Sequence, residues 1–144
     1  MTAAILAAQA VASAAMCGII WFVQLVHYPL FGRLDAADAA AYCTENSRLT
    51  PRVVLPPMLV EAATAAWLAV WSPPAIGRGP AALGLGLVAV AWASTLLVQM
   101  PLHGRLGREG ATSAAVTALV RSNWLRTAAW TARAALAAWM LRVG

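Results

Sequence analysis

The sequence predicts an all-α integral membrane protein, an up-down four-helix bundle made of two similar helical hairpins at about 1–72 and 73–144. The first observation behind this fold class is composition, since 62% of the 144 residues are hydrophobic, 10% are charged, and the mean hydropathy is +0.73. Soluble domains carry about 25% charged residues. The chain therefore lacks the polar side chains that cover a surface in water, which excludes a soluble enzyme, a disordered tail and a nucleic-acid-binding domain. The other two observations are four long apolar stretches and an internal repeat.

Four apolar stretches are long enough to cross a bilayer, at about 2–28, 52–72, 80–102 and 124–141. A membrane-spanning helix needs about 20 mainly apolar residues, and proline, glycine or charged residues separate these four stretches. The first stretch has no basic residue before it and is too long for the apolar core of a signal peptide, so we expect it to remain as a helix. The whole chain, 1–144, then forms one transmembrane domain.

Two amphipathic segments lie between the predicted spans, at about 36–48 and 111–121. We expect each to form a short, separate helix on the cytoplasmic side of the membrane. Thr50 and Ser122 would then be the N-caps of the spans that follow, since their hydroxyl groups can accept hydrogen bonds from the first turn of a helix. Pro51 suits the first helical position after Thr50.

The arginines predict the orientation of the chain. All ten basic residues are arginine in an alanine-rich sequence, which is typical of bacteria with GC-rich genomes. Basic residues are enriched in cytoplasmic loops. Seven arginines fall on one side of the predicted bundle and two on the other, namely Arg33, Arg48, Arg52, Arg105, Arg108, Arg121 and Arg126 against Arg78 and Arg142. The sequence therefore predicts a multi-pass protein of the bacterial inner (plasma) membrane with both termini outside.

The chain repeats itself at an offset of 72 residues. Residues 25–34 align with 97–106, with seven of ten positions identical, and residues 61–67 align with 133–139. Each half then contains two spans, and an even number of spans inserts both halves the same way up. We expect a parallel repeat about an axis along the membrane normal.

Two ionisable side chains lie inside the predicted spans at matching depth. Glu61 and Arg133 are each about nine residues from the cytoplasmic end of their helix, or roughly 14 Å at 1.5 Å per residue. One interpretation is a buried ion pair that fixes helix packing, because leaving either charge unpaired would be costly. The other is a polar cavity that holds a substrate, since a charge inside a span usually marks function.

A polar stripe on the last span supports the cavity. Residues at i, i+3, i+7 and i+10 share one helix face, and here they are Asn123, Arg126, Trp130 and Arg133. The first and third spans add polar side chains near their cytoplasmic ends, namely Gln24, His27, Tyr28, Gln99 and His103. A mainly apolar pocket with a few convergent polar groups is the usual form of a small-molecule site. We therefore expect a substrate cavity in the cytoplasmic half of the bundle.

His27, His103 and Glu61 leave three interpretations open. Two histidines and a carboxylate form a ligand set of non-haem iron, and two histidines alone can bind copper or haem. Without a metal, a histidine can act as a general acid or base. Each histidine can also cap a helix end at the membrane interface. No metal-binding spacing motif occurs in the sequence, so no cofactor is assigned.

Two motifs resemble those of a known family. The motif Pro-Leu-His-Gly-Arg-Leu at 101–106 ends the third span, and Asn-Trp-Leu-Arg-Thr at 123–127 leads into Trp130 and Arg133 in the fourth. In this layout the chain is similar to small four-helix bacterial membrane proteins of unknown function related to anthrone oxygenases. The family often has asparagine where this chain has His103. The resemblance implies an oxygen-dependent enzyme that acts on a lipophilic aromatic or quinone-like molecule, without a conventional bound cofactor.

Under this resemblance, five residues take catalytic roles. His27 or His103 would remove a proton from a phenol or an activated carbon, which gives a carbanion able to react with O2. Arg126 and Arg133 would stabilise the developing oxyanion. Glu61 would share the polar cavity with Arg133.

Five further residues would bind the substrate. Tyr28 and Trp130 would stack on an aromatic ring. Gln24, Gln99 and Asn123 would orient the substrate oxygens through their side-chain amides.

Two other classes of function stay open. A homodimeric transporter or exporter of a small molecule or ion would use Glu61 to couple protons or bind ions. A non-catalytic membrane assembly protein would tolerate alanine at Arg126, Trp130 and His27. The lipid bilayer is the expected partner in every case, a small lipophilic molecule is the expected substrate of an enzyme, and nucleic acid is not expected.

Overall fold

The computed structural model describes the backbone of residues 1–144 and the side chains of all of them except Ala36, Ala37 and Ser113. Within this described part every regular element is helical and no strand occurs. Four long helices form the bundle, and two of them contain a short π-helical segment. In chain order they are a first helix made of α1 (Thr2–Phe22), η1 (Val23–His27) and α2 (Tyr28–Phe31), then α3 (Ala36–Val70), then a third helix made of α4 (Arg78–Ser94), η2 (Thr95–Gln99) and α5 (Met100–Glu109), and finally α6 (Ser113–Val143).

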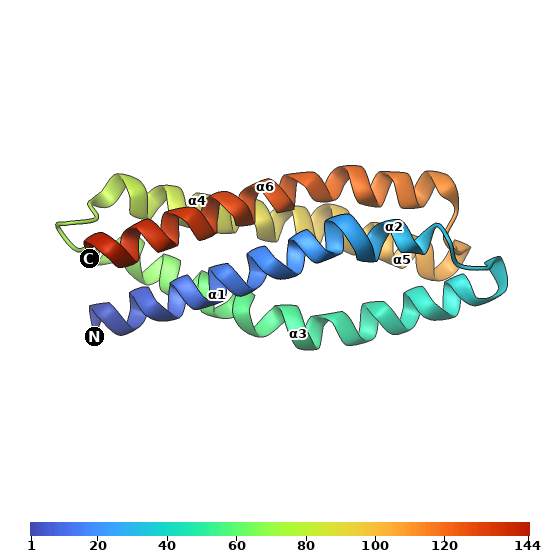
Figure 1. The fold of residues 1–144 in the computed structure, drawn as a ribbon, viewed down its shortest axis with the longest axis horizontal. Coiled ribbons are helices and arrows are strands. Elements are labelled where there is room, and N and C mark those ends of the chain that lie inside the picture. Colours follow the sequence, from blue (N-terminus) through green and yellow to red (C-terminus); the bar gives the residue numbers. More distant parts are fainter.

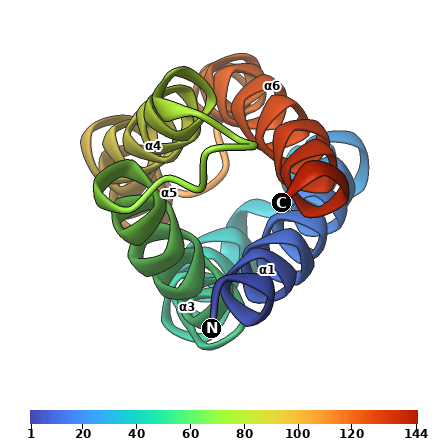
Figure 2. The same ribbon diagram turned by 90° about the vertical axis from the view of Figure 1, so that its left-hand side faces the viewer.

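The four helices run up and down, so the N- and C-termini lie at the same end of the bundle (Figure 1). We refer to the opposite end, where loops 32–35 and 110–112 lie, as the distal end. Figure 2 looks along the bundle from the terminal end and shows a ring in which α1 lies between α3 and α6, with α4 on the other side of these two. The predicted all-helical fold with four helices is confirmed.

Among the described residues, three helices are long and apolar enough to span a bilayer, at Thr2–Phe31, Asp38–Val70 and Arg78–Glu109. α6 stands apart from these three because Arg126 and Arg133 lie in its middle. Both arginines are buried inside the bundle, with 6% and 1% of their surface exposed. The charges of Arg126 and Arg133 therefore face the other helices and not the outside of the bundle.

The prediction of separate short helices at 36–48 and 111–121 was wrong. α3 and α6 run through these segments without a break. Thr50 and Ser122 consequently lie inside helices rather than at N-caps. The N-cap of α6 is instead Thr112, whose side chain accepts a hydrogen bond from the backbone N–H of Ala115 at 3.3 Å.

Packing at the distal end explains the continuous helices. Apolar side chains from all four helices form a core there that includes Phe31, Cys43, Leu106 and Leu119, each with at most 1% exposed. Burial of this surface favours docking of the segments against each other over lying flat on a membrane. α3 has 35 residues and is therefore about 52 Å long, whereas the hydrocarbon core of a bilayer is about 30 Å thick. The length of α3 thus exceeds the thickness of the hydrocarbon core of a bilayer.

Each π-helical segment is followed by a proline at the same spacing. Pro29 follows η1 and Pro101 follows η2, and η2 is η1 moved along the chain by 72 positions. A proline in a helix has no N–H to donate to the carbonyl four residues earlier, and its ring clashes with that carbonyl. The widened turn relieves this conflict, and the N–H groups of Tyr28 and Met100 donate to carbonyls five residues back. The two hairpins thus share the same local departure from an α-helix.

Candidate functional site

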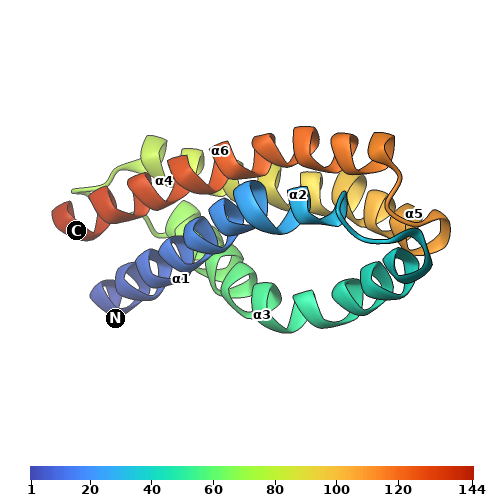
Figure 3. The ribbon, with the colours of Figure 1, turned by 45° about the vertical axis from the view of Figure 1, so that its right-hand side comes forward.

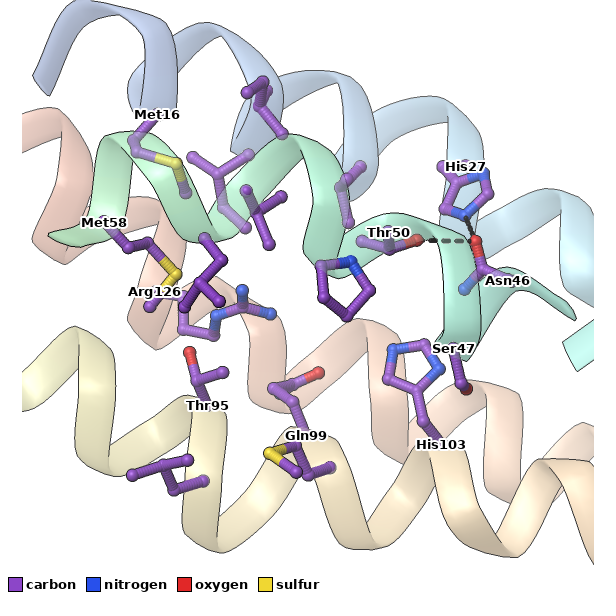
Figure 4. A pocket seen from close by; sticks show the side chains of 18 of the residues that line it. Met16, His27, Asn46, Ser47, Thr50, Met58, Thr95, Gln99, His103 and Arg126 are labelled. Carbon is purple, nitrogen blue, oxygen red and sulfur yellow. Dashed lines mark hydrogen bonds between the residues drawn. The ribbon is translucent and has the colours of Figure 1, made fainter. Parts of the chain in front are cut away.

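A cavity of about 420 Å³ lies between the first helix, α3 and the third helix, with one side chain from α6 (Figure 4). Small-molecule sites usually have volumes of about 300–1,000 Å³. α3 contains Pro51, Pro56 and Pro57, and Figure 3 shows this helix curving along the stretch that borders the cavity. Prolines inside a helix bend it, so the sequence of α3 accounts for its curvature here.

The cavity is apolar at one end and polar at the other. The apolar end lies near the middle of the bundle and is lined by Met16, Ile20, Val54, Met58 and Trp92. The polar end lies toward the distal end and is lined by His27, Asn46, Ser47, Thr50 and His103. Arg126, Tyr28 and Gln99 also border the space. An amphipathic molecule with an apolar body and one polar edge matches this gradient.

A cluster of three side chains joins the helices at the polar end. The phenol oxygen of Tyr28 lies 2.9 Å from Nε2 of His103. Nη1 of Arg126 donates to the same oxygen at 3.5 Å and to Oδ1 of Asn123 at 3.1 Å. Because a guanidinium only donates, Tyr28 can accept from Arg126 and donate its own proton to His103. Nδ1 of His103 has no hydrogen-bond partner within the part of the chain whose side chains are described.

The second histidine is held by α3. Nε2 of His27 lies 2.9 Å from Oδ1 of Asn46, and the hydroxyl of Thr50 donates to the same oxygen at 3.0 Å. An amide oxygen only accepts, so Nε2 of His27 is the donor in this pair. Figure 4 shows both bonds at the wall of the cavity.

Behind Arg126, a buried network fastens the first helix to α6. Nδ2 of Asn123 and the hydroxyl of Thr127 both donate to Oε1 of Gln24, at 2.9 and 3.2 Å. Nε2 of Gln24 donates to the backbone carbonyl of Val120 at 3.2 Å. Gln24, Asn123 and Thr127 have at most 2% of their surface exposed, so the network lies fully inside the bundle. It holds in place the part of α6 from which the Arg126 side chain extends.

Glu61 lies in a separate buried centre. The hydroxyl of Ser13 donates to its Oε1 at 2.6 Å, and the indole Nε1 of Trp130 donates to its Oε2 at 2.8 Å. The ion pairs among the described side chains are Arg48–Glu45 and Arg105–Glu109, both exposed. The expected direct Glu61–Arg133 ion pair was therefore wrong, because Ser13 and Trp130 supply the donors that Arg133 was expected to supply.

Arg133 lies one helical turn beyond Trp130 and is 1% exposed. Among the described residues, none of its three guanidinium nitrogens has a hydrogen-bond partner. A Cβ placed on Gly84 would come within 3.2 Å of its Nη1 and 3.6 Å of its Cζ. The missing side chain at Gly84 therefore leaves the room into which the guanidinium fits.

The structure brings five of the ten predicted site residues to the cavity and leaves five behind its wall. Those that line it are His27, Tyr28, Gln99, His103 and Arg126. Those that do not are Gln24, Glu61, Asn123, Trp130 and Arg133. The prediction that these last five contact a molecule in the cavity was wrong. Gln24 and Asn123 bond to each other, Glu61 bonds to Ser13 and Trp130, and the guanidinium of Arg133 lies beside Gly84.

Sequence reasoning missed the contribution of α3 to the site. Asn46, Ser47 and Thr50 line the polar end, but the segment 36–48 was expected to be a separate surface helix. The signal was the spacing of Asn46 and Thr50, which share one face only if the helix continues beyond residue 48 as far as Thr50.

The metal interpretation of His27, His103 and Glu61 is not supported by their positions. No group of three His, Cys, Asp or Glu side chains in the described part of the chain lies close enough to hold a metal ion. Glu61 is instead bonded to Ser13 and Trp130.

Comparison of the chain with protein-family models, with curated proteins and with solved structures finds no match.

Proposed function

We propose that the protein is an integral membrane, oxygenase-like enzyme that acts on a small lipophilic aromatic or quinone-like molecule in this cavity. The observation that carries the proposal is the Tyr28–His103–Arg126 cluster at the polar end of an otherwise apolar cavity. The apolar end would hold the rings, and the cluster would meet the oxygen of the substrate. The likeness of the motifs at 101–106 and 123–127 to anthrone-oxygenase-related proteins agrees with this function.

The cluster supplies a base and a cation, as an oxidation that begins with loss of a proton requires. His103, through Tyr28 or directly, would accept a proton from the substrate, because a histidine near neutral pH serves as a general base. Arg126 would stabilise the negative charge that develops on the substrate oxygen, and this stabilisation is strong where water is excluded. His27, held by Asn46, is the second proton acceptor on the same wall.

With anthrone as substrate, the reaction balances without a further reductant. The carbanion formed at the ring CH2 gives its electrons to O2, and the proton taken up earlier completes a carbon-bound hydroperoxide. Loss of the remaining C–H proton, with cleavage of the O–O bond, releases water and leaves a ketone. One anthrone and one O2 therefore give one anthraquinone and one water.

The residues behind the wall would act indirectly. Gln24 and Asn123 would position Arg126 through the hydrogen bonds given above. Trp130 lies under the same guanidinium, with its ring centroid 5.0 Å from Cζ of Arg126, and a cation over an aromatic face is stabilised there. Glu61 and Arg133 would stabilise the middle of the bundle.

We also infer that the bundle spans the bacterial inner membrane with both termini outside and that its hairpins arose by duplication. The three apolar helices and the arginines support the first point, because Arg78 begins α4 and Arg142 lies in the last turn of α6, both at the terminal end, whereas most of the others lie toward the distal end. The matching π-helical segments support the second. Alkaline phosphatase fused after Gly144 would be active if the C-terminus is outside, and inactive if the orientation is reversed.

The enzymatic proposal is tested with purified protein in lipid nanodiscs, with anthrone as the substrate. We expect O2 uptake and anthraquinone formation in equal amounts, at a rate well above that of empty nanodiscs. The double variant His27→Ala/His103→Ala would lose this activity. Unchanged product formation by that variant, with helical content and melting behaviour intact, would refute the proposal.

A further inference from the structure

Two helix–helix contacts, which we call seams, occupy equivalent positions in the repeat but differ in chemistry. The first seam joins the first helix to α6, and the second joins the third helix to α3. Moving along the chain by 72 positions converts one into the other. The residues of the first seam are Gln24, Tyr28, Asn123 and Thr127, and their counterparts in the second are Leu96, Met100, Pro51 and Leu55.

The first seam is closed by hydrogen bonds. Asn123 and Thr127 donate to Gln24, and Tyr28 accepts from Arg126. Their exposed fractions are 2% for Gln24, 5% for Tyr28, 0% for Asn123 and 1% for Thr127. Separating these helices would leave buried polar groups without partners, which is costly, above all in a lipid environment.

The four counterpart residues of the second seam form no such hydrogen bonds. Leu55, Leu96 and Met100 are 41%, 49% and 58% exposed, and Pro51 is exposed as well. All four also line the cavity, so this seam combines accessible apolar surface with cavity lining. Leu55, Leu96 and Met100 form no hydrogen bonds through their aliphatic side chains, and Pro51 lacks even a backbone N–H.

We propose that the second seam is a lateral gate through which a lipophilic ligand passes between the bilayer and the cavity. The proposal rests on the proposed function and adds the route and the class of ligand, a flat apolar ring system that is dissolved in the membrane. Lipid tails are as apolar as leucine, so lipid or ligand carbons can pack against Leu55 and Leu96 when the two helices move apart. The cost of opening is therefore much lower here than at the first seam.

The repeat itself supplies the experiment. The triple variant Pro51→Asn/Leu55→Thr/Leu96→Gln copies the polar fastening of the first seam onto the second. A matched control, Val53→Asn/Leu59→Thr/Leu97→Gln, places the same residue types on exposed positions of the same helices, at 61%, 52% and 75% exposure. Each protein in nanodiscs is loaded with 1-hydroxyanthraquinone, which quenches tryptophan fluorescence, and is mixed with an excess of empty vesicles. The recovery of fluorescence gives the rate at which the probe leaves.

We expect the fastened variant to release the probe about tenfold or more slowly than wild type, which corresponds to about one hydrogen bond that must break. In the control variant, whose three positions lie outside the cavity lining, both the amount bound at equilibrium and the release rate would stay close to wild type. A fastened variant that loads the probe and releases it at the wild-type rate would overturn the gate and leave the proposed function standing. Failure of wild-type protein to load the probe would instead count against the proposed function.

A second variant covers the case in which the polar triple variant does not fold. Leu55→Cys/Leu96→Cys, in a background with Cys17→Ala and Cys43→Ala, is joined by a reversible bifunctional thiol reagent. We expect the joined protein to release the probe slowly and to recover its original rate after reduction. The same fast release before and after joining would overturn the gate.

Discussion

The phenol oxygen of Tyr28 and Nε2 of His103 lie 2.9 Å apart, although the two residues are 75 positions apart in the chain. Tyr28 is the first residue of α2 and His103 lies in α5, so the contact joins the first and third helices. Each residue follows a π-helical segment by only one to four positions. The turn that accommodates Pro29 and Pro101 therefore also sets the direction of the two side chains across the polar end of the cavity.

Removing the Tyr28 hydroxyl would test this contact. We expect Tyr28→Phe to lower the rate of anthrone oxidation by about 10- to 100-fold, because His103 loses its partner and Arg126 loses an acceptor. His103→Ala would lower it by about 100-fold or more, as for loss of a general base. Tyr42→Phe is the matched control, since Tyr42 is 44% exposed and lies outside the cavity. Equal rates for the Tyr28 and Tyr42 variants would contradict a role for the cluster.

The buried carboxylate of Glu61 makes stability depend on Trp130. Trp130→Phe would leave Oε2 of Glu61 without the donor at 2.8 Å, and an unsatisfied buried polar group costs about 1–3 kcal/mol. We therefore expect a lower midpoint of thermal unfolding in detergent, followed by circular dichroism. Trp139→Phe, on the same helix but 41% exposed, would change the midpoint little. A similar decrease in both variants would show that ring volume matters more than the hydrogen bond.

The residues that face the bundle interior could be predicted, but their partners could not. Periodicity placed Asn123, Arg126, Trp130 and Arg133 on one face of one helix, and all four are buried. Depth placed Glu61 level with Arg133. Spacing along a helix does not fix how far each helix is rotated about its axis. That rotation places the carboxylate of Glu61 within hydrogen-bonding distance of Trp130 and Ser13.

The part of the site on α3 was unpredictable for a different reason. Pro51, after Thr50, has the pattern of a helix start, and local propensity favours a break there. The structure keeps the helix intact because the distal core buries Cys43 against Phe31 and Leu119, and tertiary packing outweighs a local preference. Asn46 and Thr50 thereby reach the cavity. The local sequence around Pro51 does not reveal this packing, because the packing depends on side chains of the other helices.

Gly84 offers a test of how Arg133 is accommodated. Gly84→Ala would place a Cβ 3.2 Å from Nη1 of Arg133 and displace a buried guanidinium. Gly86→Ala is the control, because nothing lies within 4 Å of a Cβ at that position. Alanine is better than glycine in a helix by about 0.5–1 kcal/mol, so we expect the Gly86 variant to melt at or above the wild-type temperature and the Gly84 variant below it. Two variants that melt at the same temperature would mean that Arg133 moves without cost.

Arg126→Lys would separate charge from geometry at the cavity. A lysine keeps the positive charge and could still donate two hydrogen bonds from one nitrogen, as Nη1 of Arg126 does, but it lacks the planar guanidinium that lies over the Trp130 ring. We expect kcat for anthrone to fall by about tenfold or more while KM changes less, because the lost interaction is with charge that develops during the reaction. Arg121→Lys, on the exposed face of α6, would leave both constants unchanged. Wild-type kcat in the Arg126 variant would show that any cation suffices, and the planar guanidinium would then have no part in the oxidation.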